Sequence, residues 1–171
     1  MPPDADSAAE TAPIEVSNDF LKSEYLFLSR CLNEENRDFV ESVCSDLDQI
    51  NRVLKINNAH VGYRVRDEVV FYMLNNRKAG LLNRDEAFDN AVMQKILPRI
   101  QGSSASVRDM LCELFKIFTG DFEEYRTRND DTASGMFDKL SRDSVRYPRS
   151  AEKTAFMVKR FDEDGSTSYW L

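Results

Sequence analysis

The chain has few of the features that mark an enzyme, a secreted protein or a membrane protein. It holds one histidine and three cysteines at unrelated spacings, Cys31, Cys44 and Cys112, so neither a disulfide framework nor a metal site is predicted. No apolar run approaches the length of a membrane span. The N-terminus has neither the basic nor the apolar segment of a secretory signal. We expect a cytoplasmic protein with free thiols.

An excess of basic charge is also missing. The first nineteen residues hold five acids and no Lys or Arg, and beyond them 25 acids face 23 bases. Such a balanced body has no basic face from which nucleic-acid binding follows, so we do not expect direct DNA binding. Residues 1–18 are rich in Ala, Pro, Ser and acids, which predicts a disordered acidic arm ahead of a domain spanning 19–171.

The domain shows the spacing of amphipathic helices. Apolar residues recur at steps of three and four in stretches that begin near positions 33, 65, 85, 104 and 150, where Ser150 is the expected cap of the last helix. Pro98 is expected to kink or end the third helix. Residues 120–146 are polar with scattered aromatics and predict a long irregular loop. The pattern predicts an all-α helical bundle of about four to five helices, without strand pairing.

Motifs for independent catalysis are absent from the sequence. It has no GxxxxGK[ST] phosphate-binding loop, no GxSxG, no HExxH and no paired cysteines. The acidic pairs Asp67/Glu68 and Asp85/Glu86 are interpreted as surface groups or salt-bridge partners, because charges usually lie on solvated helix faces. We therefore do not expect the chain to be an enzyme by itself.

Two arginines occupy a place where the helix dipole does not favour cations. In GYRVRDEVVFYML, residues 62–74, Arg64 and Arg66 follow Gly62 at the expected start of a helix. Guanidinium groups at this positive helix end need solvent, a carboxylate or an anion. A phosphate brought there by another domain would meet both guanidinium groups and free backbone N–H groups. The alternative is ion pairing, for example of Arg66 with Glu68 or with an acid on an adjacent helix.

A second basic stretch follows the third predicted helix. QKILPRIQGSS, residues 94–104, places Lys95 and Arg99 near a helix C-terminus, where the dipole itself favours cations. That preference accounts for both residues. Contact with a partner or with nucleic acid is the other interpretation, and Lys95 and Arg99 are the candidates for it.

Three stretches together resemble a known family. GYRVRDEVVFYML, AFDNAVMQKILPRIQGS and YPRSAEKTAFMVKRFDEDGSTSYW are similar, in order and spacing, to the C-terminal region of McrB-like AAA+ NTPases, the motors of modification-dependent restriction systems. The resemblance covers residues 47–171 and implies a helical lid, which in that family follows the nucleotide-binding core. The phosphate-binding loop, the Mg²⁺-binding acidic strand and the sensor asparagine of that core are missing here. The resemblance thus implies a non-catalytic lid-type module or a C-terminal fragment of such a motor.

The same resemblance implies partners and site residues. A lid arginine at the start of a helix can approach the nucleotide γ-phosphate, so Arg64 is the first candidate for a nucleotide sensor and Arg66 the second. The chain would bind no cofactor alone, and ATP or GTP with magnesium would come with an AAA+ core. Its partners would be that core or neighbouring subunits of a ring, with an endonuclease subunit as a further candidate. The module would couple nucleotide state to these subunits in a defence motor.

Two other functions are consistent with the residues. One is a stand-alone helical protein-interaction or regulatory protein with no nucleotide role. The other is a helical nucleic-acid-binding module, which would use seven cations: Lys95, Arg99, Arg108, Arg146, Arg149, Lys153 and Lys159. The near-neutral body argues against the second of these.

Overall fold

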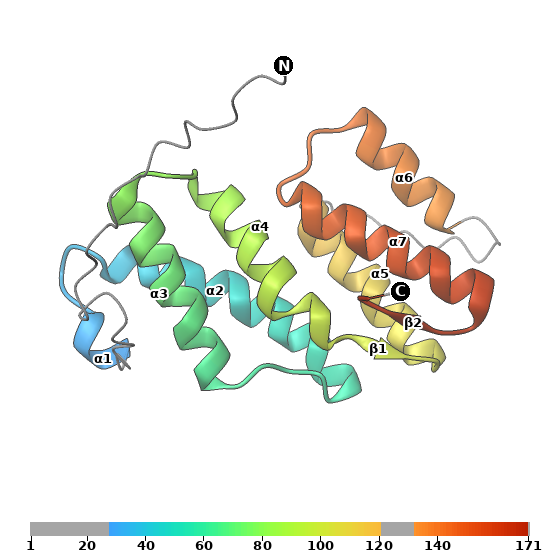
Figure 1. The fold of residues 1–171 in the computed structure, drawn as a ribbon, viewed down its shortest axis with the longest axis horizontal. Coiled ribbons are helices and arrows are strands. Elements are labelled where there is room, and N and C mark those ends of the chain that lie inside the picture. The colour runs from blue at the N-terminus through green and yellow to red at the C-terminus, as the bar shows by residue number, and fades with distance from the viewer. Residues whose placement is uncertain (1–27, 121–131, 171) are drawn as a thin grey trace, which may run out of the picture.

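Helices dominate the computed structural model, which describes residues 28–120 and 132–170 (Figure 1). The predicted arm at 1–18 lies outside the described residues. The longer helices are α2 (Arg37–Leu54), α3 (Tyr63–Ala79), α4 (Arg84–Lys95), α5 (Ala105–Thr119), α6 (Thr132–Arg142) and α7 (Pro148–Asp164). The shorter elements are α1 (Leu28–Cys31), the 3₁₀ turns η2 (Lys55–Asn57) and η3 (Leu97–Arg99), and strands β1 (Gln101–Gly102) and β2 (Thr167–Ser168). The prediction of an all-α bundle is confirmed.

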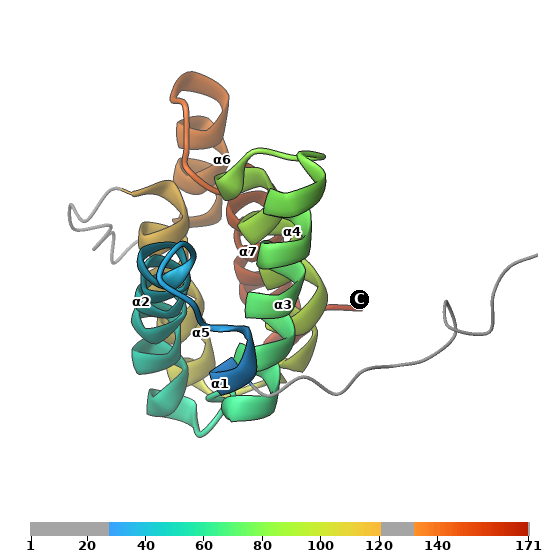
Figure 2. The same ribbon diagram turned by 90° about the vertical axis from the view of Figure 1, so that its left-hand side faces the viewer.

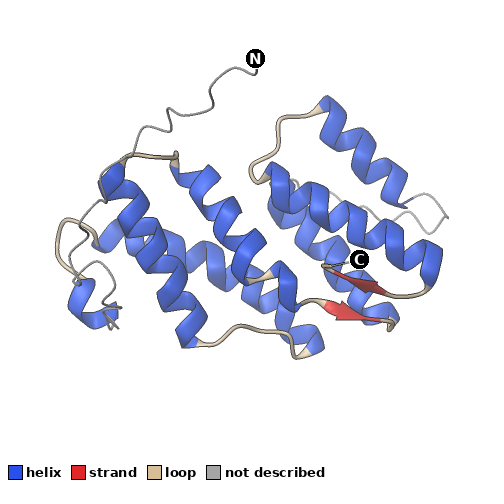
Figure 3. Cartoon of the chain, in the orientation of Figure 1, coloured by secondary structure: helices blue, strands red, loops and turns tan. Residues whose placement is uncertain are grey.

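The helices form two groups around one core. In the first, α3 packs between α2 and α4, and in the second, α7 packs between α5 and α6 (Figure 1). Contacts of α2 with α5 and of α4 with α7 join the groups (Figure 2). β1 and β2 pair antiparallel and connect the segment before α5 to the segment after α7 (Figure 3). This pairing could not be predicted from the sequence, because two-residue strands are too short to show a period of two.

The core is built from the apolar positions that the helical spacing indicated. Val43, Ile50 and Leu54 of α2 are each at most 1% exposed, as are Leu111 and Leu114 of α5. A buried helix stripe of this kind supplies most of the stability of a helical bundle. No helix in the described part of the chain is long and apolar enough to cross a lipid bilayer.

An aromatic cluster joins the two helix groups. Tyr147, at the start of α7, is 1% exposed. Its ring centroid lies 5.1 Å from that of Phe88 on α4 and 6.4 Å from that of Phe118 on α5. Tyr72 of α3 is 37% exposed, because Val69, Val70 and Met73 already occupy the inward face of that helix.

Local signals set the ends of α3 and α4. α3 ends at Gly80, whose φ of +63° is a left-handed conformation that glycine adopts without strain. α4 begins after Asn83, whose side chain accepts from the Glu86 backbone N–H while the Glu86 carboxylate accepts from that of Asn83. α4 ends at Lys95, and Pro98 lies in η3, so the expected break at this proline is confirmed.

Two expectations about the C-terminal half are wrong. The predicted irregular loop at 120–146 contains helix α6, because Ala133, Met136, Phe137 and Leu140 form an apolar stripe that packs on α7. The expected cap of the last helix, Ser150, lies inside α7 and is fully buried. Tertiary contact, which residue spacing does not show, decides both outcomes.

A cluster of charges fixes the start of α4 and the start of α7 to α2. Arg84 contacts Asp46 at 2.7 Å and Asp85 at 2.8 Å, and Arg146 contacts the same two carboxylates at 3.0 and 3.3 Å. Burial opposes the charge of Arg84, but hydrogen bonds with Asp46 and Asp85 hold the pKa of Arg84 above its ordinary value. Burial, with the charge of Asp46, raises the pKa of Tyr147, whose hydroxyl donates to Asp46 at 3.1 Å. This network is architectural.

Candidate functional site

The start of α3 leaves backbone donors open. Gly62 is the N-cap residue in an extended conformation and offers no side chain to cap the helix. Its carbonyl accepts from the N–H groups of Val65 and Arg66 at 3.1 and 3.3 Å. Within the described ranges, the N–H groups of Tyr63 and Arg64 donate to no protein group. The positive end of the α3 dipole therefore faces outward with two donors free.

Two asparagines hold the segment before α3 in place. Asn51 of α2 donates to the Val61 carbonyl at 3.1 Å and accepts from the Val61 N–H at 2.7 Å. Asn57 of η2 donates to the Ser106 carbonyl at 2.7 Å and accepts from the Ser106 hydroxyl at 2.6 Å. The start of α3 is thus fixed to α2, and the preceding turn is fixed to α5.

The Glu68 carboxylate brings together two of the predicted site residues. Arg64 contacts one carboxylate oxygen at 3.2 Å, and Lys95 of α4 contacts the other at 3.0 Å. The hydrogen bond from Lys95, and then the one from Arg64, hold the pKa of Glu68 below its usual range. The Arg64 side chain stays 82% exposed, so this ion pair is solvent-screened and of little energetic value. Arg64 is free to exchange Glu68 for a stronger anion.

Arg66 points to the opposite side of α3 from Glu68. Its guanidinium group contacts the Asp67 carboxylate at 2.6 Å and lies 4.9 Å from the centre of the Tyr63 ring. Arg66 therefore forms an ion pair, which was the predicted alternative to anion binding. Its partner is Asp67 rather than Glu68. Glu68 pairs instead with Arg64, because residues four apart on a helix are neighbours whereas residues two apart are not.

A cleft lies between the C-terminal half of α2 and the start of α3. It has a volume of about 560 Å³, and Arg66 lines it. Leu47 and Val61 form apolar parts of its wall, and Lys55 and His60 add basic groups. Both predicted sensor candidates thus start from the same turn of α3, with Arg66 in the cleft and Arg64 on the solvent-exposed face.

Cys44 also lines this cleft but is a poor nucleophile. Burial raises the pKa of its thiol, and nearby Arg66 offsets this only in part. Burial raises the pKa of the Cys112 thiol to about 11. Because the thiolate is the reactive form, neither thiol is activated for nucleophilic attack. In the described residues, no group of three His, Cys, Asp or Glu side chains is placed to hold a metal ion.

The other predicted contact residues do not gather into one basic surface. Arg99 is exposed in η3 and forms no ion pair with any described residue. Of the seven cations proposed for nucleic-acid contact, four are engaged by carboxylates: Lys95, Arg108, Arg146 and Lys159. Arg149 and Lys153, like Arg99, form no ion pair with a described residue, and both belong to α7.

The assembled residues suit the binding of an anion. Two N–H donors, two guanidinium groups, Lys55 and His60 surround the start of α3. A phosphate group uses donors of these types at helix N-termini. Lys55, His60 and Tyr63 were not predicted as site residues. They reach the site because the Asn51 hydrogen bonds hold the segment between α2 and α3 against α2. In the sequence, this placement of the segment is indicated only by Asn51 near the end of one helix and Gly62 before the next.

The comparisons with known proteins give one match. A family model described as a domain of unknown function (DUF8727) matches residues 12–167. No curated protein and no solved structure matches the chain.

Proposed function

The chain belongs to the DUF8727 family, and we propose that it is a non-catalytic, lid-type helical module of an AAA+ NTPase of the McrB-like kind. It would pack on the nucleotide-binding core and couple nucleotide state to partner subunits in a DNA restriction or defence motor. ATP or GTP with magnesium would be bound by the core. The module would work in the cytoplasm, alongside neighbouring ring subunits or an endonuclease subunit.

The observation that carries this proposal is the outward-facing start of α3. Arg64 is 82% exposed on the first turn, beside two N–H groups that have no partner among the described residues. A γ-phosphate held by a core would meet the helix dipole, the N–H groups and a guanidinium group together. Hydrolysis would still require the phosphate-binding loop and magnesium ligands of that core.

Arg64 has the role of sensor in this proposal, and Arg66 supports it. The ion pair of Arg64 with Glu68 is exposed and exchangeable, whereas Asp67 and the Tyr63 ring both hold Arg66. Glu68 would act as a resting partner that keeps Arg64 in place until a phosphate competes for it. Lys95 shares that carboxylate and would keep Glu68 paired after Arg64 leaves.

Binding of inorganic tripolyphosphate to the isolated chain tests the anion site. In an NMR titration we expect weak binding, in the millimolar range, with amide shifts centred on residues 62–67. Arg64→Ala is expected to weaken binding about threefold to tenfold, while Glu68→Gln tightens it about twofold to threefold by releasing Arg64.

Arg142→Ala supplies the matched control, because Arg142 pairs with Asp138 in the same i, i+4 arrangement but lies on α6. It should leave the affinity unchanged. Shifts spread evenly over all basic residues, or equal affinity for wild type and Arg64→Ala, would contradict an anion site at the start of α3. The isolated chain should hydrolyse neither ATP nor GTP.

A stand-alone interaction or regulatory protein is the second candidate. The buried core that residues of α2 to α7 share favours it, because a domain with its own hydrophobic core can fold without a motor. A monodisperse chain that binds no tripolyphosphate at the start of α3 would favour this second function over the lid.

A further inference from the structure

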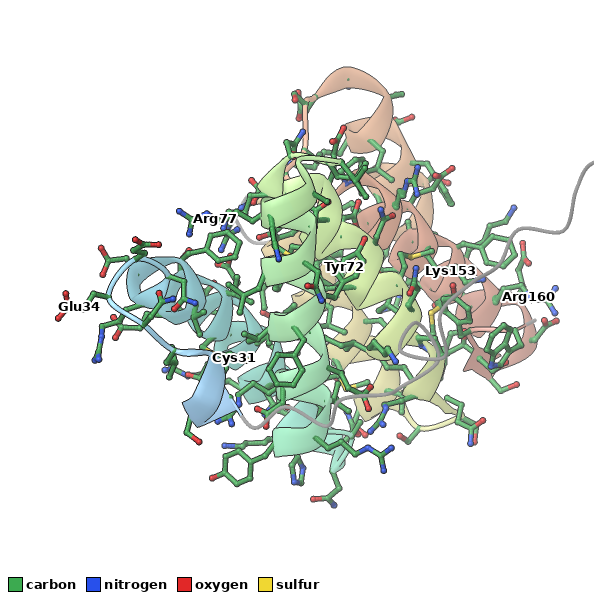
Figure 4. All side chains as sticks on the ribbon, turned by 60° about the vertical axis from the view of Figure 1, so that its left-hand side comes forward. Cys31, Glu34, Tyr72, Arg77, Lys153 and Arg160 are labelled. Carbon is green, nitrogen blue, oxygen red and sulfur yellow. The ribbon has the colours of Figure 1, made fainter. Side chains whose placement is uncertain are left out.

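A groove that shares no lining residue with the α2–α3 cleft has its own chemistry. It lies where α4, α6 and α7 meet and has a volume of about 410 Å³. Its lining consists of three apolar and three charged side chains: Met93, Phe137, Arg149, Glu152, Lys153 and Phe156. Figure 4 shows Lys153 at the surface of α7. The proposed lid function uses none of these residues.

Lys153 stands among aromatic rings. Its Nζ lies 5.0 Å from the centre of the Phe156 ring and 4.7 Å from that of Tyr169. The Tyr169 ring lies 4.8 Å from that of Trp170, which is 78% exposed. The apolar groove therefore continues through Lys153 onto an exposed aromatic surface.

The positive charges of this groove have no carboxylate partner in the described parts of the chain. Lys153 forms no ion pair there, and the Arg149 guanidinium group donates to the neutral Asn90 side chain at 2.7 Å. Burial lowers the pKa of Lys153, since no nearby acid compensates for lost water. Elsewhere in the fold, partly buried arginines such as Arg84 and Arg108 are paired with acids. The two cations of this groove are thus an exception in the fold, and an external anion would supply their missing partner.

We infer that this groove binds an acidic peptide segment of a partner protein, with one large apolar side chain between carboxylates. Arg149 and Lys153 are four residues apart on α7 and so lie on one helix face, about 6 Å apart at their Cβ atoms. Two carboxylates of an extended peptide would pair with them. The apolar side chain would enter between Met93, Phe137 and Phe156. Met, aromatic and Arg side chains are enriched at protein interfaces.

A nucleic-acid strand fits this surface less well. Glu152 lies inside the groove, and Asp162, Glu163 and Asp164 occupy the last turn of the same helix. A continuous row of phosphates would meet these acids, whereas a peptide places its charges only where the cations lie.

Fluorescence anisotropy with defined probes tests the inference on the full chain. The probe is a short fluorescein-labelled peptide of glutamates around one phenylalanine, and its controls replace the glutamates by glutamine or the phenylalanine by alanine. We expect the glutamate probe to bind about tenfold more tightly than either control peptide. Lys153→Gln should weaken it about threefold to fivefold, and Phe156→Ala about tenfold.

Lys159→Gln is the control variant, since Lys159 lies on α7 but pairs with Glu163. It should bind like wild type. Equal binding of the glutamate and glutamine peptides would overturn the inference, as would equal losses from Lys153→Gln and Lys159→Gln. Tighter binding of an oligothymidylate that Lys153→Gln abolishes would assign the groove to nucleic acid instead.

The chain's own acidic N-terminal segment is another occupant that the experiment separates. Glu10→Gln, Glu15→Gln and Asp19→Asn together remove three of its charges in the full chain. This variant should bind the probe like wild type if the groove serves a partner. A several-fold gain in affinity would show that the segment competes for the groove and would overturn a partner in trans.

Discussion

Replacement of Asp89 by alanine is expected to lower the free energy of unfolding by about 3 kcal/mol. Asp89 lies on α4, is 2% exposed, and accepts from the backbone N–H groups of Arg149 and Ser150 at 2.8 Å each. It also accepts from the Ser150 hydroxyl. One buried carboxylate thus caps α7 from another helix, and its removal leaves the two backbone N–H groups of Arg149 and Ser150 without their acceptor. Urea unfolding followed by far-UV circular dichroism measures the loss.

The control for this prediction is Asp109→Ala. Asp109 is exposed on α5, and its carboxylate makes no hydrogen bond with any described residue. Loss of this carboxylate should change the free energy of unfolding by at most about 0.5 kcal/mol. Asp89→Asn retains one oxygen acceptor and should fall between Asp89→Ala and wild type. If Asp89→Ala and Asp109→Ala unfold at the same urea concentration, then Asp89 does not cap α7.

The second large effect is expected in a reconstituted motor. When the chain is added to a McrB-like AAA+ core that lacks its own lid, it should raise the rate of ATP or GTP hydrolysis. Arg64→Ala should lose that stimulation about a hundredfold, because a cation placed at the transferred phosphate stabilises charge in the transition state. The exposed pair with Glu68 is too weak to account for such a loss by unfolding. Steady-state release of phosphate is the measurement.

Arg99→Ala is the matched control in the motor. Arg99 is exposed like Arg64, but it lies in η3 rather than at the start of α3, and it forms no ion pair with a described residue. It should leave hydrolysis within about twofold of wild type. Circular dichroism should show full helix content for both variants. Equal rates for Arg64→Ala, Arg99→Ala and wild type would contradict the sensor role.

The helices that could be predicted from the sequence are those whose buried face follows from the spacing of apolar residues alone. Leu47 and Ile50 of α2, like Leu111 and Leu114 of α5, follow the steps of three and four and lie in the core. The ends of α3 at Gly80 and of α7 at Gly165 were predictable from the sequence, because glycine often ends a helix in the left-handed conformation. Both glycines adopt that conformation.

Features that depend on contacts distant in the sequence were not predictable. α6 has Ser134 and Gly135 in its first half, which weaken the helical signal, and packing on α7 stabilises it. The role of Ser150 was also not predictable. As the expected cap it would stand before the helix, but Asp89 supplies the capping oxygens from 61 residues away and Ser150 bonds to it from within α7.

For the candidate site, the residues were predictable from the sequence, but their partners were not. Gly62, Arg64 and Arg66 lie at the start of α3 as predicted. That Lys95 shares Glu68 with Arg64 depends on the packing of α4 against α3, which spacing does not reveal. The cleft beside Arg66 depends in turn on the hydrogen bonds of Asn51 with Val61.

The measurement that most directly tests the proposed function is photo-crosslinking with a nucleotide that carries an azidoanilide on its γ-phosphate. The assembled core and chain are irradiated, and mass spectrometry locates the labelled peptide. If the start of α3 faces the γ-phosphate, the label in this chain will lie within residues 60–68. Labelling of the core alone, or of α7 in place of α3, would contradict a lid that presents Arg64 to the nucleotide.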